Sequence, residues 1–402
     1  MTATRNKRIL SVQPVGDGGG SEHALIRMFR QLTEDGWECH VAVPAPVRLA
    51  EEYASAGATL HVLPMAKLTT SGGPWRWVAF AAAWPVTVAR LALLVLQTRA
   101  GLVHTNSLHS WVGWAAAAVT HRPHVWHARE IVFQSAAALR LERFLARNFA
   151  DLVIAMSGAI ADQLDPANVV VITDEADPLV FRPDRAGTFR AAVGIPDELV
   201  LVGSAARLDT WKGFDSLLEA FPIVREQRPG VDLVIAGAPV AGKEAYAAAL
   251  ESRAASVEGA HWLGHRSDVA DLMADLDVFV AVSTEPEPFG LVVVESLASG
   301  VPVVAGAAGG PLEILGAEAV EQTTPAGRLV EPGNAPAIAD AIVSLLPERS
   351  STRARRERVP LRKPEEGRFA EVLADVLRAG RLSAWRRFPG RPGARRRTTL
   401  PS

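Results

Sequence analysis

Short apolar runs rich in β-branched residues recur through the first half of the chain, and a segment with helical spacing of its apolar positions follows most of them. This alternation is typical of parallel strands joined by crossover helices, because a strand buried on both faces is apolar throughout while its covering helix is apolar on one side. The predicted strands are residues 9–14, 39–44, 60–64, 101–106, 124–128, 151–156 and 169–172.

A second series of the same kind begins after a proline-bearing linker at Phe181, Arg182 and Pro183. Its predicted strands are residues 199–205, 231–237, 261–264, 277–282 and 301–306, and a helix over 336–346 ends it. We therefore predict an α/β fold with two Rossmann-like, doubly wound domains. The domains are residues 1–182 and 183–346, and residues 347–402 form closing helices and a basic, partly disordered tail.

The loop after the first strand of the second series carries two cations. Arg207 follows the strand, and Lys212 lies near the start of a predicted helix. One face of that helix holds Phe214, Leu217, Leu218, Phe221 and Val224. Two cations beside a helix N-terminus are suited to neutralise a diphosphate and to stabilise it as a leaving group.

Residues 285–310 place two carboxylates around a Phe-Gly turn. Glu287 precedes Phe289 and Gly290, and Glu295 follows them. The three valines after the turn favour a strand by local propensity. However, Gly300 is a plausible helix stop and a buried strand follows it, so we predict a helix that begins near Gly290. Glu295 then points back toward the helix N-terminus, where a nucleotide diphosphate would bind.

These two motifs resemble those of the retaining glycosyltransferases of family 4, and the resemblance covers about residues 8–346. Glu287 and Glu295 match the E-x7-E motif, and Arg207 and Lys212 match the R-x4-K motif. The resemblance implies the GT-B fold, in which two Rossmann-like domains face a cleft. It also implies that the first Glu contacts the donor sugar, the second the ribose, and the two cations the diphosphate.

Three first-domain residues take roles from the same resemblance. Gly19 and Gly20, in the glycine-rich turn after the first strand, match the turn near the donor phosphates. His127, at the end of a predicted strand, matches an active-site histidine that contacts the donor sugar. Its neighbours Arg129 and Glu130 could orient it or bind the acceptor. A satisfied structural histidine is the alternative for His127.

No metal cofactor is expected. Asp275 and Asp277 form a D-x-D sequence, but they fall where a predicted helix enters a strand, so a capping or solvated role is favoured. The histidines around His127 lack the spacing of metal ligands. The family generally needs no divalent metal either, so a nucleotide-diphosphate sugar is the expected co-substrate.

Composition favours a soluble protein of the cytoplasm. The chain has 402 residues, of which 49% are hydrophobic and 21% charged. Its single cysteine, Cys39, excludes an internal disulfide, and the N-terminus lacks the apolar core of a signal peptide. Residues 78–96 are long and apolar enough to span a bilayer but include Pro85 and Arg90. We interpret them as a helix packed on the sheet, with membrane contact left open.

Charge is distributed unevenly along the chain. Residues 352–402 contain 15 Lys and Arg against 5 Asp and Glu, although the whole chain has a formal net charge of −2. This tail is interpreted either as solvated or as a peripheral contact with an anionic membrane. No nucleic-acid recognition motif accompanies it.

The resemblance implies a retaining glycosyltransferase that moves a sugar from a nucleotide-diphosphate donor to a sugar, lipid-linked or small-molecule acceptor. Its products would be cell-envelope glycans, glycolipids or specialised metabolites, made in the cytoplasm or at the inner face of the membrane. Two alternatives on the same fold are a nucleotide-sugar epimerase or hydrolase and a non-catalytic nucleotide-sugar-binding protein. A membrane-tethered scaffold built on the basic tail is a further class.

Overall fold

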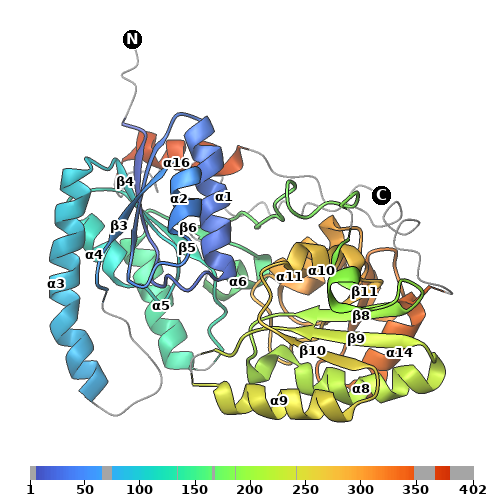
Figure 1. Ribbon diagram of the computed structural model, residues 1–402. Coiled ribbons are helices and arrows are strands. Elements are labelled where there is room, and N and C mark those ends of the chain that lie inside the picture. The colour runs from blue at the N-terminus through green and yellow to red at the C-terminus, as the bar shows by residue number, and fades with distance from the viewer. Residues whose placement is uncertain are drawn as a thin grey trace. The chain divides into compact units, whose positions relative to one another are not determined.

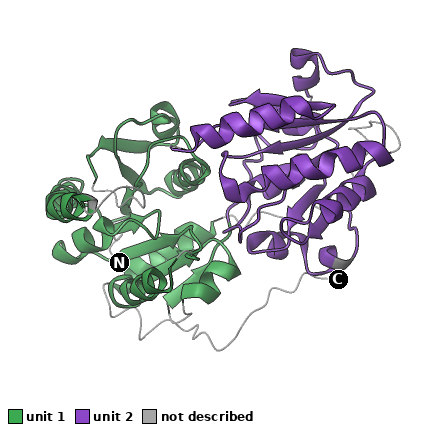
Figure 2. Cartoon of the chain, turned by 90° about the horizontal axis from the view of Figure 1, so that it is seen from below, with its two compact units in different colours: residues 1–173, 365–402 green, residues 174–364 purple. Residues whose placement is uncertain are grey.

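The computed structural model describes residues 6–65, 75–133, 135–164, 168–185, 187–240, 242–347 and 367–380. The chain divides into two compact units, unit 1 (residues 1–173 and 365–402) and unit 2 (residues 174–364), shown in Figure 2. Each unit is built on one parallel sheet, so the predicted pair of doubly wound α/β folds is confirmed. Of the predicted basic tail, only residues 367–380 lie within the described part of the chain.

Unit 1 has a seven-stranded parallel sheet in the order β3-β2-β1-β4-β5-β6-β7. In register, Ile9 pairs with Cys39 on one side and with Leu102 on the other. The strands are β1 (Arg8–Val12), β2 (Glu38–Val43), β3 (Ala58–Val62), β4 (Leu102–Thr105), β5 (His124–Ala128), β6 (Leu152–Ala155) and β7 (Val169–Val171).

Helices cover both faces of this sheet (Figure 1). They are α1 (Gly20–Glu34), α2 (Ala50–Ser55), α3 (Trp75–Gln97), α4 (Val112–Val119), α5 (Ala136–Phe149), α6 (Gly158–Leu164) and α16 (Arg368–Ala379). Successive residues of β1 enter different cores: Ile9 joins the core under α1, α2 and α16, and Leu10 joins the core under α3 and α4.

The C-terminal helix α16 belongs to unit 1 although about two hundred residues separate it from β7. Leu373 and Val376 are buried among side chains of α1 and β1. The apolar residues of α16 recur every three or four positions, which is why one face of this helix can close the core.

Unit 2 has a six-stranded parallel sheet in the order β10-β9-β8-β11-β12-β13. Val200 and Val202 pack on one face of the sheet and Leu201 on the other, as the two-residue period of a strand requires. The strands are β8 (Val200–Ala205), β9 (Val231–Ala236), β10 (Ala260–Gly264), β11 (Val278–Ala281), β12 (Val303–Gly306) and β13 (Gly327–Val330).

The helices of unit 2 lie on both faces of its sheet (Figure 1). They are α7 (Phe189–Val193), the 3-10 turn η2 (Thr210–Lys212), α8 (Phe214–Gln227), α9 (Glu244–Ser256), α10 (Val269–Asp275), α11 (Leu291–Ala298), α12 (Gly310–Leu315), α13 (Glu318–Glu321) and α14 (Ala335–Leu345). The predicted apolar face of α8 is buried, which confirms the pattern read from the sequence.

Of two ambiguous sequence patterns, one was missed and the other was predicted correctly. Strand β13 is absent from the predicted series because its four residues include Arg328 and follow a turn-rich segment. Residues 291–298 are helical despite their valines, as predicted, and Gly290 precedes them with φ of 95°. Gly300 follows with φ of 74°, a left-handed conformation that glycine adopts without strain.

Candidate active site

The order of strands in unit 2 reverses between β8 and β11. From β8 the chain proceeds outward to β9 and β10, and from β11 it proceeds outward to β12 and β13. Ligands of open α/β sheets bind at such a switch point, beyond the carboxyl ends of the strands. The loops that leave β8 and β11 carry Arg207, Lys212 and Glu287, so the unit 2 residues predicted to act nearest the reacting groups gather here.

An ion pair joins the two loops at this edge. Nζ of Lys212 donates to Oε2 of Glu287 at 2.6 Å, although 75 positions separate the two residues. Both side chains are largely buried, with 12% and 16% of their surfaces exposed. The Lys212 ammonium also lies 4.1 Å from the centre of the Trp211 ring, a cation–π contact. Partial burial strengthens these interactions relative to an exposed pair.

Several contacts fix the Glu287 carboxylate and its backbone. Oγ of Ser283, just after β11, donates to Oε2 of Glu287 at 2.8 Å. The amide of Gly310 donates to the Glu287 carbonyl at 2.8 Å, and Glu287 forms a parallel bridge with Gly309. A Cβ at position 309 would lie 2.1 Å from that carbonyl oxygen. Glycine is therefore required where the loop after β12 meets the Glu287 loop.

A glycine also lets the Lys212 loop approach β11. Gly213 has φ of 77°, and a Cβ there would lie 1.9 Å from the carbonyl oxygen of Val282. The amide of Thr284 donates to the Trp211 carbonyl at 2.7 Å, which ties the same loops together. The close approach of these backbones is what brings Lys212 within reach of Glu287.

Helix α11 begins directly after the Phe-Gly turn and carries Glu295 on its second turn. The amides of Leu291 and Val292 precede the first intrahelical hydrogen bond, which Val293 makes with the Gly290 carbonyl. A helix N-terminus of this kind favours an anion. Glu295 is partly exposed, whereas Phe289 as a whole is 1% exposed, so its contact with the donor stays a prediction.

Arg207 lies on the loop between β8 and η2, where it was predicted, and its side chain is exposed. Like Lys212, it adds positive charge at the carboxyl edge of β8. The pair therefore fits the chemistry of a diphosphate, and the assignment itself stays a prediction.

The glycine-rich turn of unit 1 is held by carboxylates of its own. The Gly18 amide donates to Oε2 of Glu22 at 2.6 Å, and the Tyr53 hydroxyl donates to Oε1 at 3.2 Å. Burial raises the pKa of Glu22, although the bonds from Gly18 and Tyr53 act against this shift. Gly19 is the N-cap of α1 and Gly20 its first residue. The predicted role of these two glycines beside donor phosphates is not tested by these contacts.

The strand order of unit 1 reverses between β1 and β4, and a buried polar network spans that point. Nδ2 of Asn106, after β4, donates to Oε1 of Gln13, after β1, at 2.8 Å. Nε of Arg129, after β5, donates to Oδ1 of Asn106 at 2.6 Å. Sequence reasoning missed Gln13 and Asn106. Each lies at the carboxyl end of a predicted strand, where ligands of open α/β sheets gather, and that position is the signal that would have found them.

His127, predicted to be catalytic, has no exposed surface. Its Nδ1 lies 3.4 Å from Nε2 of His104, and its ring contacts Phe369 of α16. Among the described residues, its buried Nε2 has no hydrogen-bond partner. Burial, aided by the nearby Arg129 charge, lowers the pKa of His127 well below its usual value, so the ring is neutral. A donor sugar cannot reach the ring as it lies here, and the catalytic role stays a prediction.

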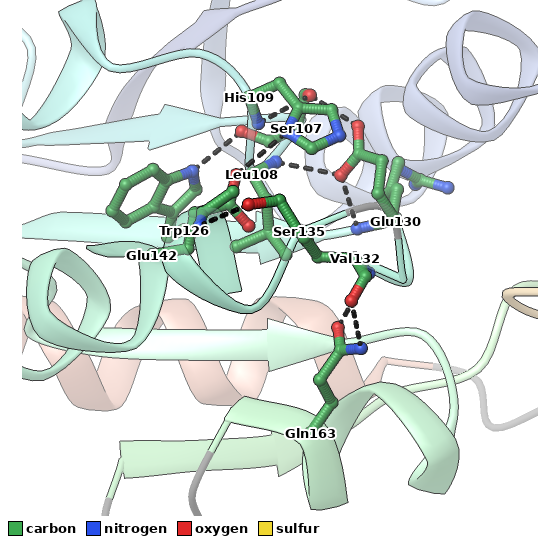
Figure 3. Close-up of polar contacts among 11 residues, drawn as sticks. Ser107, Leu108, His109, Trp126, Glu130, Val132, Ser135, Glu142 and Gln163 are labelled. Carbon is green, nitrogen blue, oxygen red and sulfur yellow. Dashed lines mark hydrogen bonds and ion pairs between the residues drawn. The ribbon is translucent and has the colours of Figure 1, made fainter. Parts of the chain in front are cut away.

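Polar side chains after β4 and β5 form a second cluster at the same edge (Figure 3). Glu130 accepts hydrogen bonds from the Ser107 hydroxyl and from the Leu108 amide, the latter at 2.9 Å. Nδ1 of His109 lies 2.8 Å from Oε1 of the buried Glu142 on α5. That hydrogen bond, with the charges of Glu130 and Glu142, raises the pKa of His109 to about 9. The imidazole is therefore protonated at neutral pH, and half of its surface is exposed.

The D-x-D sequence is part of the unit 2 core. Asp277 is fully buried, accepts from the Leu201 amide at 2.9 Å and pairs with Arg190 at 3.2 Å. Asp275 is also buried and accepts from the Arg190 amide at 2.9 Å. Of the two expected roles, the solvated one is wrong. The Asp275 carboxylate accepts from an amide in the first turn of α7, as a capping group does, and the Asp277 carboxylate binds the Arg190 side chain and the Leu201 amide. In the described part of the chain, no group of three or more His, Cys, Asp or Glu side chains could hold a metal ion.

Two family models match the chain, one on each unit. Glycosyltransferase Family 4 matches residues 18–173, and Glycosyl transferases group 1 matches residues 186–360. The D-inositol 3-phosphate glycosyltransferase of Stackebrandtia nassauensis is 27% identical over 334 residues, 73% of each chain. The lipopolysaccharide core biosynthesis mannosyltransferase LpsB of Rhizobium meliloti is 29% identical over 56% of this chain and 70% of LpsB.

Among solved structures, Anabaena Alr3699/HepE in complex with UDP and glucose is similar to this chain with a TM-score of 0.73 and 26% identity. The match covers 91% of this chain and 99% of that one. A second structure of the same protein, with UDP alone, matches with a TM-score of 0.70 and 25% identity.

Proposed function

Since the chain belongs to the glycosyltransferases of family 4, whose group 1 domain forms its unit 2, we propose that it transfers a sugar from a UDP-sugar to an acceptor hydroxyl with retention of anomeric configuration. The UDP donor is suggested by the complexes of Alr3699/HepE with UDP and with UDP and glucose. Retention follows from the family resemblance.

The observation that carries the proposal is the ion pair between Lys212 and Glu287 at the switch point of the unit 2 sheet. Negative charge develops on the diphosphate as its bond to the sugar breaks, and a preformed cation stabilises that charge without reorganisation. An ammonium has three N–H groups, so Lys212 can keep its bond to Glu287 while it donates to a phosphate oxygen. The pair thus links the carboxylate assigned to the sugar with the cation assigned to the leaving group.

The other unit 2 residues complete this donor site. We assign Arg207 and the N-terminus of α11 to the diphosphate, Glu295 to the ribose hydroxyls, and Glu287 to the sugar hydroxyls. A carboxylate is a strong acceptor for hydroxyl groups, and charge-assisted bonds of this kind are short and specific. We also assign Phe289 and Gly290, which lie between the two glutamates at the start of α11, to the donor.

For unit 1 we propose the roles that the family resemblance implies. Gly19 and Gly20 lie next to donor phosphates. His127 is assigned to the donor sugar, a role that requires its buried ring to become accessible when the donor binds. The acceptor is a sugar, a lipid-linked sugar or a small molecule of cell-envelope or specialised metabolism. The relatives that act on inositol 3-phosphate and in lipopolysaccharide core biosynthesis suggest these classes. We place the enzyme in the cytoplasm, in peripheral contact with the inner face of the membrane.

The experiment that tests the function combines donor binding with product analysis. The purified chain is screened by thermal shift against UDP-, GDP-, ADP- and TDP-sugars, and by calorimetry for the donor that stabilises it. Glu295→Ala is expected to weaken binding of that donor at least about tenfold, because a charged hydrogen bond contributes about 1.5–3 kcal/mol. Unchanged affinity would remove Glu295 from the site.

Product analysis separates the alternatives on the same fold. With an acceptor library, a transferase forms a glycoside whose anomeric configuration, read by proton NMR, matches that of the donor. An epimerase or hydrolase forms product when no acceptor is present. A protein that binds the donor but yields no product under either condition is a non-catalytic homologue.

A further inference from the structure

Helix α3 has an apolar face that no described residue of unit 1 covers. Its 23 residues include the exposed side chains Val78, Val86, Leu93 and Leu96, each between 51% and 56% exposed. These residues recur at spacings that place them on one side of the helix. On the opposite side, Val88, Leu91 and Val95 are buried in the core with β1 and β4. The helix is thus apolar all round although only one side is packed.

Helix α5 extends the same apolar surface. Leu141, Phe144 and Phe149 are exposed on it, and Val119 is exposed at the end of α4. Figure 1 shows α3, α4 and α5 along one side of unit 1. Among the described residues, 16 large hydrophobic side chains are exposed, and 11 of them lie between residues 75 and 149. Such a concentration in one region marks an interaction surface.

A recess joins α3 to α5 within this surface. It has a volume of about 330 Å³ and is lined by Phe80, Ala81, Trp84, Trp111, Trp114, Leu141 and Leu145. Trp114 stacks on Phe149 with ring centres 4.3 Å apart, so the recess and the exposed face are continuous. Among the described residues, the buried indole N–H groups of Trp111 and Trp114 have no hydrogen-bond partner. The lining is therefore suited to apolar chains.

The charges around this surface have one sign. Residues 75–150 contain eight arginines and two acids, Glu130 and Glu142. Glu142 is buried, and Glu130 binds the Ser107 hydroxyl and the Leu108 amide. Among those arginines whose burial the structure describes, the exposed ones are Arg90, Arg99, Arg140, Arg143 and Arg147. On the adjoining helix α6, Asp162 is the exposed acid. An apolar face edged by arginine complements the headgroups and acyl chains of anionic lipids.

We propose that the outer face of α3 and α5, with the recess between them, docks unit 1 onto the surface of an anionic phospholipid bilayer. Trp75 and Trp77, both highly exposed at the start of α3, lie at the headgroup level, as tryptophan does at membrane interfaces. Arg140, Arg143 and Arg147 bind lipid phosphates. The inference rests on the proposed peripheral location, and it assigns the contact to α3 and α5 rather than to the basic tail.

Helix α3 lies on the bilayer and does not cross it. Residues 77–97 are long and apolar enough to span a membrane, and only 22% of an 18-residue apolar stretch within them is buried. However, spanning would withdraw Val88, Leu91 and Val95 from the core that holds β1 and β4.

A second copy of the chain is a poorer occupant of this face than lipid. A two-fold contact would bring the arginines of α5 near the same arginines of the partner, without exposed acids on α3 to α5 to offset them.

The test is co-sedimentation of the full chain with phosphatidylcholine vesicles that contain or lack phosphatidylglycerol. We expect binding that needs phosphatidylglycerol and weakens with salt. The double variant Leu93→Gln/Phe144→Gln and the double variant Arg143→Gln/Arg147→Gln are each expected to reduce partitioning about tenfold or more. The matched control Leu179→Gln/Val320→Gln changes two exposed apolar residues of unit 2 and should bind as the unaltered chain does.

Each of the other outcomes contradicts the proposal. If the unaltered chain does not bind vesicles, the peripheral location itself fails. If it binds and both variants bind equally well, the contact lies elsewhere. Loss of binding only after removal of residues 381–402 would assign the contact to the tail. Light scattering could instead show a dimer that Leu93→Gln/Phe144→Gln dissociates, which would assign the face to a second copy. Vesicle-bound protein that resists carbonate extraction would mean that α3 spans the bilayer.

Unchanged thermal stabilisation by the UDP-sugar shows that each variant is folded.

Discussion

At the scale of single residues, the unit 2 site depends on pairs that the chain brings together from distant positions. Lys212 alone is an ordinary loop lysine, and Glu287 alone is an ordinary loop glutamate. Their contact at 2.6 Å, with Ser283 as a second donor, converts both into a partly buried and preorganised pair. A residue of this kind contributes to stability as well as to ligand binding, so a test must separate the two.

Replacement of Lys212 by alanine should weaken UDP-sugar binding by about tenfold to a hundredfold, because a charged hydrogen bond to the diphosphate is lost. Calorimetric titration of the donor measures this change. Lys7→Ala is the matched control, since Lys7 is a unit 1 lysine whose Nζ bonds the Asp35 carbonyl far along the sequence from the site. Donor affinity equal to that of the control would show that Lys212 serves only to hold Glu287.

His109 should make stability depend on pH. Its pKa is raised to about 9 by the hydrogen bond to Glu142 and by nearby charges, whereas an unfolded chain has an ordinary value near 6.5. The stabilisation is therefore complete below about pH 6.5 and is lost as the pH rises toward 9. The difference in melting temperature between the unaltered chain and His109→Gln should shrink over that range. A constant difference would mean that the pKa is not raised, and NMR titration of the ring with Glu142→Gln gives the direct value.

At the scale of elements, the helix that completes a core need not be near that core in sequence. Helix α16 supplies Leu373 and Val376 to unit 1 from the far end of the chain. Its amphipathic spacing predicts that one face is buried, but not against what. Helix α3 shows the converse case. Its apolar face is evident in the sequence, and no element in the described part of the chain covers it.

Leu373→Ala should destabilise unit 1 by about 2–5 kcal/mol, the usual cost of removing a buried leucine side chain. Urea denaturation followed by circular dichroism measures the loss as a lower transition midpoint. Arg378→Ala, on the exposed side of the same helix, should change stability by less than about 0.5 kcal/mol. Equal midpoints for the two variants would contradict the packing of α16 on unit 1.

At the scale of the whole molecule, each unit presents its chemistry at the switch point of its own sheet. In unit 2 the positive charge there comes from Arg207, Lys212 and helix N-termini. These groups can neutralise a diphosphate directly, which is the work that a divalent cation does at other phosphate sites.

Stabilisation of the chain by its UDP-sugar should therefore be the same with and without a chelator. Ligand at about a hundred times its Kd adds about 2.7 kcal/mol to folding stability, and the melting temperature should rise accordingly. Differential scanning calorimetry with and without EDTA gives the comparison. A rise that EDTA abolishes, and that added magnesium restores, would assign a metal ion to the donor site.

The sequence by itself determined the two α/β series, the helix after Gly290 and the positions of Arg207, Lys212, Glu287 and Glu295 on loops and helix starts. These follow from local periodicity, glycine positions and motif spacing, which act over a few residues. The tertiary structure alone decided which distant groups meet. It paired Lys212 with Glu287, joined Asn106 to Gln13 and Arg129, and drew Asp275 and Asp277 into the core. It also buried His127 and left the outer side of α3 bare, because burial depends on what packs over a face, and a local pattern carries no information about that partner.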